Sequence, residues 1–336
     1  MDQVARWTAA ERSELFTEAA ARLGIGGALV MEKDFWVCWT LRHVAALRNQ
    51  PRLIFKGGTS LSKVFRLIRR FSEDIDLAFH RHDLGFSGQR DPAAPDLSRR
   101  QRVRLVRELE EAAKARIRDS FLPVLTSEFA ASLGETPALR IDPSNAEAII
   151  FEYPHGLAEA AYAGAYVRPR VLLELGAKSD HDPQVLGTVR PYVAEAFPEQ
   201  FASPTVDIPT LAAERTFWEK ATLLHERALR PRPADRVSRH YHDVVVLARS
   251  SAGEAALAAP ELLRRVAEHK EIFFKVGGGV YQCAVPGTLR LVPPDEVLAG
   301  LRTDYGRMRE MFFDDPMPFD DVISGLRALE GRVNRS

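Results

Sequence analysis

The chain has 336 residues, of which 46% are hydrophobic, so it is long enough for two lobes and apolar enough for a substantial core. Its 46 Lys and Arg residues balance its 46 Asp and Glu residues, which excludes a general attraction to nucleic acid and leaves only local basic patches for such a contact. Two cysteines cannot form a disulfide framework or a four-ligand zinc site, and the absence of a membrane-length apolar run predicts a cytoplasmic protein without a membrane partner.

The first half of the chain has the pattern of a mixed α/β lobe. It begins with an amphipathic helix predicted at 8–24, where Thr8 and Glu11 have the spacing of a capping box. The next helix is expected at 32–47, followed by a short strand at 53–55 that stops at two glycines. The remaining elements expected in this half are a helix capped by Thr59 or Ser60 and running to about 69, a strand at 71–79, a loop at 83–100, a charged helix at 98–121, short strands and turns at 123–170 and a strand at 171–175.

The second half has a different pattern. Residues 180–209 are rich in proline and are predicted to connect two lobes. Helices are expected after them at 210–229, 237–249, 260–272, 295–311 and 319–333. The sequence therefore predicts an α+β protein with one domain at 1–205 and a mainly helical C-terminal domain at 206–336.

An Asp-x-Asp pair lies within the predicted strand at 71–79. Side chains alternate along a strand, so Asp74 and Asp76 share one face with Ser72, while the apolar residues at 75, 77 and 79 face the core. Two carboxylates on one face repel each other, and a hard divalent cation such as Mg²⁺ or Mn²⁺ relieves that repulsion. Such a cation can also bridge triphosphate oxygens, so Asp74 and Asp76 are predicted as metal ligands and catalytic residues.

Two glycines precede this strand at 57 and 58 and are followed by hydroxyl residues. Glycine lets the backbone approach a phosphate, and a helix N-terminus presents free N–H groups that favour an anion. This is not a Walker A loop, because no Gly-Lys-Ser/Thr follows at the required distance. The nucleotide-binding residues predicted from this region are Gly57, Gly58, Thr59, Ser60, Lys63, Arg70 and Ser72.

A Gly-Gly-Ser or Gly-Gly-Thr turn followed by Asp-x-Asp resembles the signature of the DNA polymerase β-like nucleotidyltransferase superfamily. More specifically, Phe-Lys-Gly-Gly-Thr-Ser-Leu-Ser-Lys at 55–63 and Phe-Ser-Glu-Asp-Ile-Asp-Leu at 71–77 are similar to segments of the AbiEii/AbiGii toxin nucleotidyltransferases. Further similar segments lie at 32–35, 217–220, 239–243, 289–294 and 304–311. The resemblance implies a polymerase-β-like core, which consists of a small mixed sheet with helices. This core would be joined to a helical C-terminal lobe.

The resemblance also implies a function. The chain would be the toxin of a bacterial toxin–antitoxin or abortive-infection pair, which transfers a nucleotide from a nucleoside triphosphate to RNA. The implied acceptor is the 3′ end of tRNA, and the implied partner is a cognate antitoxin, often a winged-helix repressor. Two alternatives stay open, namely transfer to a protein or small molecule and nucleotide binding without turnover. The intact Asp-x-Asp pair argues against the second.

Three residues further along the chain are candidates for the catalytic site, each with an alternative. Glu174, in an apolar strand, is either the third acid that helps to deprotonate the attacking hydroxyl or a salt-bridged glutamate. Lys220, on an apolar helix face, either snorkels or, as the resemblance implies, holds the triphosphate. Asp243 has two interpretations. The resemblance implies an acid that positions either Lys220 or the acceptor molecule, and the alternative is an acid at the start of a helix that pairs with Arg239.

Two further features are open to two interpretations. Ser72 is either a phosphorylation switch, because an added phosphate would repel the triphosphate, or a locally hydrogen-bonded serine. The arginines at 99–107 and 227–239 either follow an RNA backbone or lie on solvated surfaces. A zinc site at His240 and His242 is disfavoured, because no further ligand lies nearby.

Overall fold

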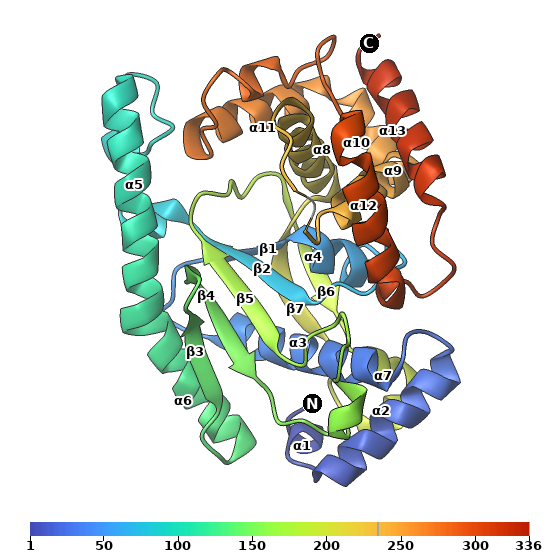
Figure 1. Cartoon of the computed structure of the whole chain (residues 1–336). Helices are drawn as coiled ribbons and strands as arrows, with labels where there is room; N and C mark the ends of the chain where they lie inside the picture. Colours follow the sequence, from blue (N-terminus) through green and yellow to red (C-terminus); the bar gives the residue numbers. More distant parts are fainter. Residues whose placement is uncertain (234, 336) are drawn as a thin grey trace.

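The computed structural model describes residues 1–233 and 235–335 (Figure 1). Within these residues seven strands form one mixed sheet in the order β3-β4-β5-β2-β1-β7-β6. β2 lies near its centre, antiparallel to β1 and parallel to β5. The strands are β1 (Leu53–Lys56), β2 (Asp74–Phe79), β3 (Ala138–Asp142), β4 (Asn145–Glu152), β5 (Val171–Gly176), β6 (Gln184–Val189) and β7 (Val206–Leu211).

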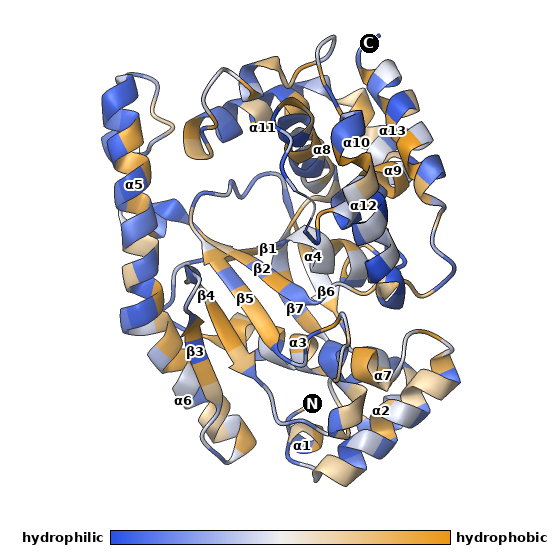
Figure 2. Cartoon of the chain, in the orientation of Figure 1, coloured by the Kyte–Doolittle hydropathy of each residue, from blue (hydrophilic) through white to orange (hydrophobic). Residues whose placement is uncertain are grey.

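Helices of the first half of the chain cover the apolar side of this sheet. α3 packs against β2, β5 and β7, and aromatic side chains fill the space between α3, α6 and β4, with the Trp39 and Phe129 ring centroids 4.5 Å apart. The strands carry mainly apolar residues (Figure 2). The helices of this part are α1 (Asp2–Ala5), α2 (Ala9–Leu23), α3 (Ala28–Ala46), α4 (Gly57–Lys63), α5 (Arg99–Arg116), α6 (Leu122–Leu133) and α7 (Tyr192–Ala196).

Helices of the second half form a lobe with its own hydrophobic core (Figure 1). Phe217 of α8, Leu247 of α9 and Leu326 of α13 are fully buried in it. Leu61 of α4 and Phe71 from the segment before β2 belong to the same cluster, so the two lobes share apolar contacts. The helices are α8 (Ala213–Leu229), α9 (Ser238–Ala248), α10 (Ser251–Ala258), α11 (Pro260–Phe273), α12 (Asp295–Arg307) and α13 (Phe319–Val333).

The structure confirms the α+β class and several predicted elements. The Thr8 capping box at the start of α2 is present in both directions. α3 starts at Ala28, four residues before the predicted position, and the predicted strand at 171–175 is β5. None of the helices in the described ranges combines the length and the apolar character that a membrane crossing requires.

Three predictions about secondary structure are wrong. Residues 123–133 are helical rather than strands and turns, because α5 continues through one π-helical turn at 117–121 into α6. Thr59 and Ser60 do not cap α4, which begins at Gly57 with Lys56 as its N-cap residue and ends at Lys63. Residues 180–209 are not a simple connection, since they contain β6, α7 and the start of β7.

The helical lobe therefore begins after the sheet is complete. β7 follows the predicted division between 205 and 206, yet it pairs with β6 along its whole length and with β1 at Phe55. The first helix of the second lobe, α8, starts at Ala213. The division into domains at 1–205 and 206–336 stays a prediction. In the structure β7 belongs to the sheet of the first lobe, although it follows residue 205 in the sequence.

Candidate active site

A cavity of about 380 Å³ lies between the sheet and the helical lobe. This volume is within the range of pockets that enclose small ligands. Its wall on the sheet side comes from β1, β2, β5 and the start of α4, and its opposite wall comes from α8, α9 and α11. Eight of the predicted site residues line it, namely Gly57, Gly58, Arg70, Ser72, Asp74, Asp76, Glu174 and Lys220.

Three carboxylates meet on one face of the sheet. Asp74 and Asp76 both face the cavity from β2, while Ile75 and Leu77 between and after them are buried in the core. β2 and β5 are parallel, and their register places Glu174 directly beside Asp76. Burial and the neighbouring charge of Asp76 raise the pKa of Glu174 to about 7.

The two glycines are required by this crowded arrangement. Gly57 has φ +79°, and a Cβ atom there would lie 1.9 Å from Oδ2 of Asp76. A Cβ atom on Gly58 would lie 2.6 Å from Oγ of Ser72 and 3.2 Å from Nη2 of Arg70. Any side chain at 57 or 58 would therefore displace the groups that line the cavity.

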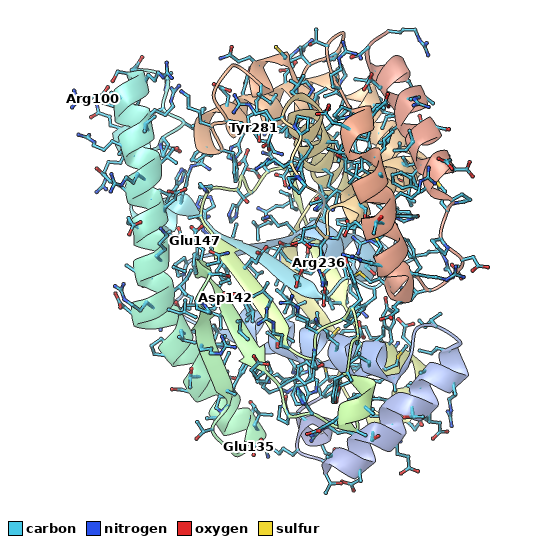
Figure 3. The ribbon with its side chains drawn as sticks, viewed as in Figure 1. Arg100, Glu135, Asp142, Glu147, Arg236 and Tyr281 are labelled. Atoms are coloured by element: carbon cyan, nitrogen blue, oxygen red, sulfur yellow. The ribbon has the colours of Figure 1, made fainter. Side chains whose placement is uncertain are left out.

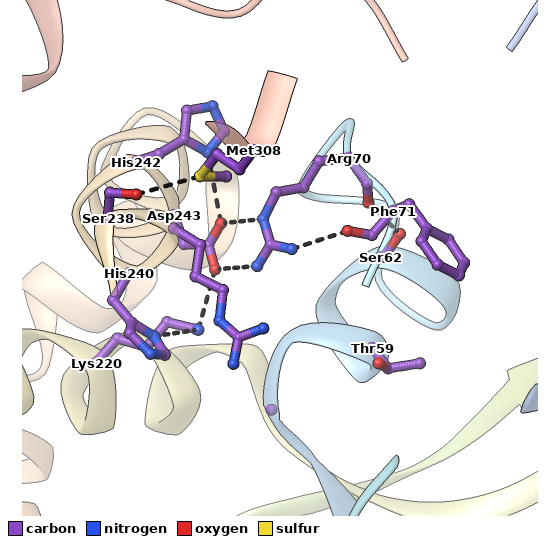
Figure 4. Close-up of polar contacts among 12 residues, drawn as sticks. Thr59, Ser62, Arg70, Phe71, Lys220, Ser238, His240, His242, Asp243 and Met308 are labelled. Atoms are coloured by element: carbon purple, nitrogen blue, oxygen red, sulfur yellow. Dashed lines mark hydrogen bonds and ion pairs between the residues drawn. The ribbon is translucent and has the colours of Figure 1, made fainter. Parts of the chain in front are cut away.

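The cations of the site are held by a buried carboxylate on α9 (Figure 4). Asp243 is fully buried and accepts two hydrogen bonds from Arg70, at 2.8 Å from Nε and 2.7 Å from Nη2. Nζ of Lys220 lies 3.0 Å from Oδ2 of the same carboxylate. Burial opposes the charge of Asp243, but Arg70 and Lys220 hold its pKa well below the usual range.

Asp243 consequently positions two cations and does not itself line the cavity. This agrees with the predicted role in placing Lys220 and differs from the alternative, an ion pair with Arg239. Nδ1 of His240 lies 3.2 Å from Nζ of Lys220, and burial holds the pKa of His240 well below its usual range, so a neutral ring accepts a hydrogen bond from the lysine. The contacts of His240 with Lys220 and of His242 with Asp243 leave the zinc interpretation without support.

The segment that carries Arg70 is fixed from outside the sheet. The backbone N–H of Phe71 donates to the carbonyl of Met311 at 2.6 Å, and that of Phe313 donates to the carbonyl of Arg69 at 3.2 Å. Oγ of Ser62 on α4 donates to the carbonyl of Arg70 at 3.0 Å. The residues after α12 therefore hold the arginine in place although they are distant in sequence.

Two cationic residues next to the aspartates were not predicted as site residues. Lys56, the last residue of β1, is paired in register with Asp76 and lines the cavity. Nη1 of Arg239 on α9 lies 3.5 Å from Oδ2 of Asp74. Signals for both were present, because Lys56 immediately precedes the Gly-Gly pair and Arg239 opens the similar segment at 239–243.

Three predicted nucleotide-binding residues lie outside the cavity lining. Oγ1 of Thr59 donates to the backbone carbonyl of Asp74, and Oγ of Ser60 donates to the carbonyl of Gly57 at 2.9 Å. Nζ of Lys63 points away from the site, 2.6 Å from Oδ1 of the buried Asp34. Thr59 and Ser60 thus support the turn from within, while Lys63 stabilises the packing of α4 on α3.

The donor set fits a hard divalent cation. Asp74 and Asp76 present carboxylate oxygens to one cavity, and Gly57 leaves free the space that a Cβ atom would take. Within residues 1–233 and 235–335, no three His, Cys, Asp or Glu side chains form a complete metal site on their own. Magnesium is commonly held by one or two carboxylates together with substrate phosphates and water, which is what this set allows.

Comparisons with known proteins identify a family. A family model described as "Nucleotidyl transferase AbiEii toxin, Type IV TA system" matches residues 39–325. No curated protein matches the chain. One similar solved structure is MenT4, nucleotidyltransferase toxin Rv2826c from Mycobacterium tuberculosis H37Rv, with 17% identity and a TM-score of 0.47 over 96% of this chain and 87% of that chain.

Proposed function

The chain belongs to the AbiEii family of nucleotidyltransferase toxins of type IV toxin–antitoxin systems, and on that premise we propose that it transfers a nucleotide to the 3′ end of tRNA. The observation that supports nucleotidyl transfer is the meeting of Asp74, Asp76 and Glu174 with a set of cations in one cavity. Acids and cations in this arrangement suit the transfer of a nucleotidyl group, in which negative charge develops on phosphate oxygens.

The acids and the cations that line the cavity have different roles in the proposed reaction. A magnesium or manganese ion on Asp74 and Asp76 would supply charge stabilisation to the α-phosphate when bound. Glu174, which lines the cavity beside Asp76, would accept the proton of the attacking 3′ hydroxyl as a general base. The hydroxyl oxygen then forms a bond to the α-phosphorus, and pyrophosphate leaves.

Lys220 and Arg70 hold the leaving group. Both side chains line the cavity, and both are oriented by Asp243. Bidentate contact with one carboxylate fixes the guanidinium plane of Arg70, which leaves N–H groups of fixed direction for phosphate oxygens. Arg239, beside Asp74, adds positive charge on the metal side.

The biological role follows from the acceptor. A tRNA with extra nucleotides at its 3′ end cannot be charged, which would halt growth, as expected of a toxin. We propose that the reaction takes place in the cytoplasm and that a cognate antitoxin, of the winged-helix repressor type, counteracts it.

The acceptor is tested with total tRNA and its periodate-oxidised form, which lacks the 3′ hydroxyl nucleophile. With magnesium and each α-labelled nucleoside triphosphate in turn, we expect label on intact tRNA and none on the oxidised form. Label that appears on protein or on a small molecule, with none on intact tRNA, would replace the tRNA proposal by one of the two other acceptor classes.

A further inference from the structure

We infer that the outer edge of β6 is an interface between two copies of this chain. A two-fold axis through Leu186 pairs β6 with β6 of the second copy in antiparallel orientation and joins the two sheets into one. This inference goes beyond the proposed function and does not depend on it, because no residue of β6 lines the catalytic cavity.

β6 forms one edge of the sheet, and β3 forms the other (Figure 1). Within the described ranges, the backbone of β6 hydrogen-bonds only to β7, through six consecutive residue pairs without a register shift. A strand at the edge of a sheet presents a row of unpaired N–H and C=O groups on its outer side. These groups of β6 are therefore free to pair with another strand.

The two edges differ in the features that normally prevent such pairing. β3 carries Arg140 and Asp142, and its register with β4 shifts between Ile141 and Asp142. Charges and irregularities of this kind protect an edge strand. β6 has the sequence Gln-Val-Leu-Gly-Thr-Val, which contains no charged residue and no proline. β6 is thus the unprotected edge of the sheet.

β6 also exposes apolar side chains. In the part of the chain that the structure describes, six large hydrophobic side chains are exposed, and two of them, Val185 and Leu186, are adjacent on this strand. Leu186 is the most exposed of the six, at 71%. A strand that pairs with the outer edge of β6 would cover these side chains together with the backbone.

The strand is complementary to itself. A two-fold axis perpendicular to the sheet keeps every side chain on its own face, so the axis must pass through a residue rather than between two. With the axis at Leu186, this leucine lies opposite its own copy. Gln184 then lies opposite Thr188 of the second copy, and Val185 lies opposite Gly187. Apolar residues face apolar or small ones, polar residues face each other, and no like charges meet, which favours the pairing.

Opposite charges flank the strand. Asp182 precedes β6 and is exposed, and Arg190 follows it, with an Nε that has no hydrogen-bond partner among the described residues. In the register centred on Leu186, Asp182 of one copy is level with Arg190 of the other at both ends of the pair. This charge complementarity argues for a second copy of the chain, rather than an unrelated strand, as the occupant of the edge.

Sedimentation velocity at protein concentrations from about 1 to 100 μM is the first test, because one strand and its flanking residues make a smaller interface than that of a permanent complex. We expect the native chain to pass from monomer to dimer as the concentration rises. Leu186→Lys should abolish the dimer, since two lysines would then lie opposite each other. Val103→Lys on α5, where the side chain is 53% exposed, is the matched control and should leave dimerisation unchanged.

Cysteine cross-linking tests the register, in a chain with Cys283→Ser so that the exposed native cysteine does not interfere. Leu186→Cys should form an intermolecular disulfide, because directly opposed residues of an antiparallel pair have Cβ atoms about 4.5–5.5 Å apart. Gln184→Cys alone should not, since its two copies would lie four residues apart along the strand, about 13 Å. A mixture of Gln184→Cys and Thr188→Cys chains should again cross-link.

The flanking charges give a test that leaves Leu186 in place. Asp182→Arg should weaken the dimer, and addition of Arg190→Asp to the same chain should restore it, because the opposite charges meet again. A native chain that stays monomeric throughout the concentration range would overturn the inference, as would a dimer that both Leu186→Lys and Asp182→Arg leave intact. Cross-linking of Gln184→Cys with itself, without cross-linking of Leu186→Cys, would overturn the register. Transfer activity enters none of these outcomes, so failure of the proposed function would leave the interface standing.

Discussion

At the scale of single residues, the adjacent arginines Arg69 and Arg70 form ion pairs that differ in their exposure to solvent. Arg70 and its partner Asp243 have 1% and 0% of their side chains exposed, whereas Arg69 and its partner Asp314 have 72% and 55% exposed. Removal of one partner from a buried ion pair leaves a charge without compensation, while exposed pairs contribute little. The pair Arg70–Asp243 therefore matters for both stability and the site.

The first prediction concerns these arginines. Arg70→Met should lower the free energy of unfolding by about 3 kcal/mol, because Asp243 then keeps only Lys220 as a close cation. Urea unfolding at pH 7 measures this change, and Arg69→Met is the matched control with a much smaller effect. Equal destabilisation by the two substitutions would show that the buried pair has no special role.

The second prediction concerns the first glycine of the turn. Gly57→Ala should reduce nucleotide transfer at least 100-fold, because the new methyl group would occupy the position 1.9 Å from Oδ2 of Asp76 and force that carboxylate to move. Gly85→Ala is a suitable control, since its φ of +86° gives the same backbone strain with no atom within 4 Å of the added Cβ. Comparable activity loss in both variants would mean that backbone strain, rather than displacement of Asp76, is responsible.

The sequence predicted which residues would line the cavity better than it predicted their contacts. Alternation along β2 correctly placed Asp74 and Asp76 opposite the buried residues, and this follows from strand geometry alone. The same motif gave no sign that Lys63 pairs with Asp34, because that contact depends on how α4 packs against α3. Side chains within one motif can therefore face different surroundings, which only tertiary packing decides.

At the scale of elements, α9 carries three groups of the site from its first two turns. These are Arg239, His240 and Asp243. The start of α9 is held by Asp304 of α12, which accepts hydrogen bonds from the backbone N–H groups of Arg236 and Ser238, both at 2.8 Å. A carboxylate that satisfies free N–H groups at a helix start acts as a cap, although here it comes from a distant helix.

The third prediction tests this cap. Asp304→Ala should lower the free energy of unfolding by about 1–2 kcal/mol and should reduce the rate of transfer, because the first turn of α9 loses its orientation. Asp295→Ala, at an exposed position of the same helix, is the control and should change both quantities less. An Asp304→Ala variant with native kcat would show that the orientation of α9 does not depend on this contact.

The wrong prediction at 180–209 has a physical cause. Proline within 180–209 suggested a connection, but Pro209 lies in β7 opposite Leu186, where the strand pairs with β6. The pairing of β7 with β1, by contrast, is limited to the register of Phe55 with Thr210. Local composition favoured a loop, and long-range pairing with β6 and β1 determined a strand.

At the scale of the whole molecule, the two lobes are connected by charges as well as by apolar contacts. The carboxylate of Glu73, next to Asp74 in the sequence, pairs with Lys33 of α3 at 2.5 Å and with Arg236 of the helical lobe. Arg236 lies where the helical lobe meets the sheet (Figure 3). Together with Leu61 and Phe71 in the second core, these contacts predict that the lobes unfold as one unit.

The fourth prediction follows from this connection. In native-state hydrogen exchange followed by mass spectrometry, the best protected amides of α3 and α8 should exchange at the same free energy, because both require global unfolding. Denaturant dependence of exchange measures this quantity for each segment. Exchange of α8 through a separate opening of lower free energy would show that the predicted domains at 1–205 and 206–336 are independent.

The measurement that tests the account most directly is transfer of label from α-labelled nucleoside triphosphates to total tRNA with magnesium, for the native chain and Asp74→Ala. We predict label on tRNA with the native chain and a loss of at least 1000-fold in Asp74→Ala, because Asp74 lines the cavity and is one of the two carboxylates that would hold the metal. Circular dichroism should show that the variant is folded. Equal labelling by a folded Asp74→Ala variant would contradict the assignment of this cavity as the catalytic site.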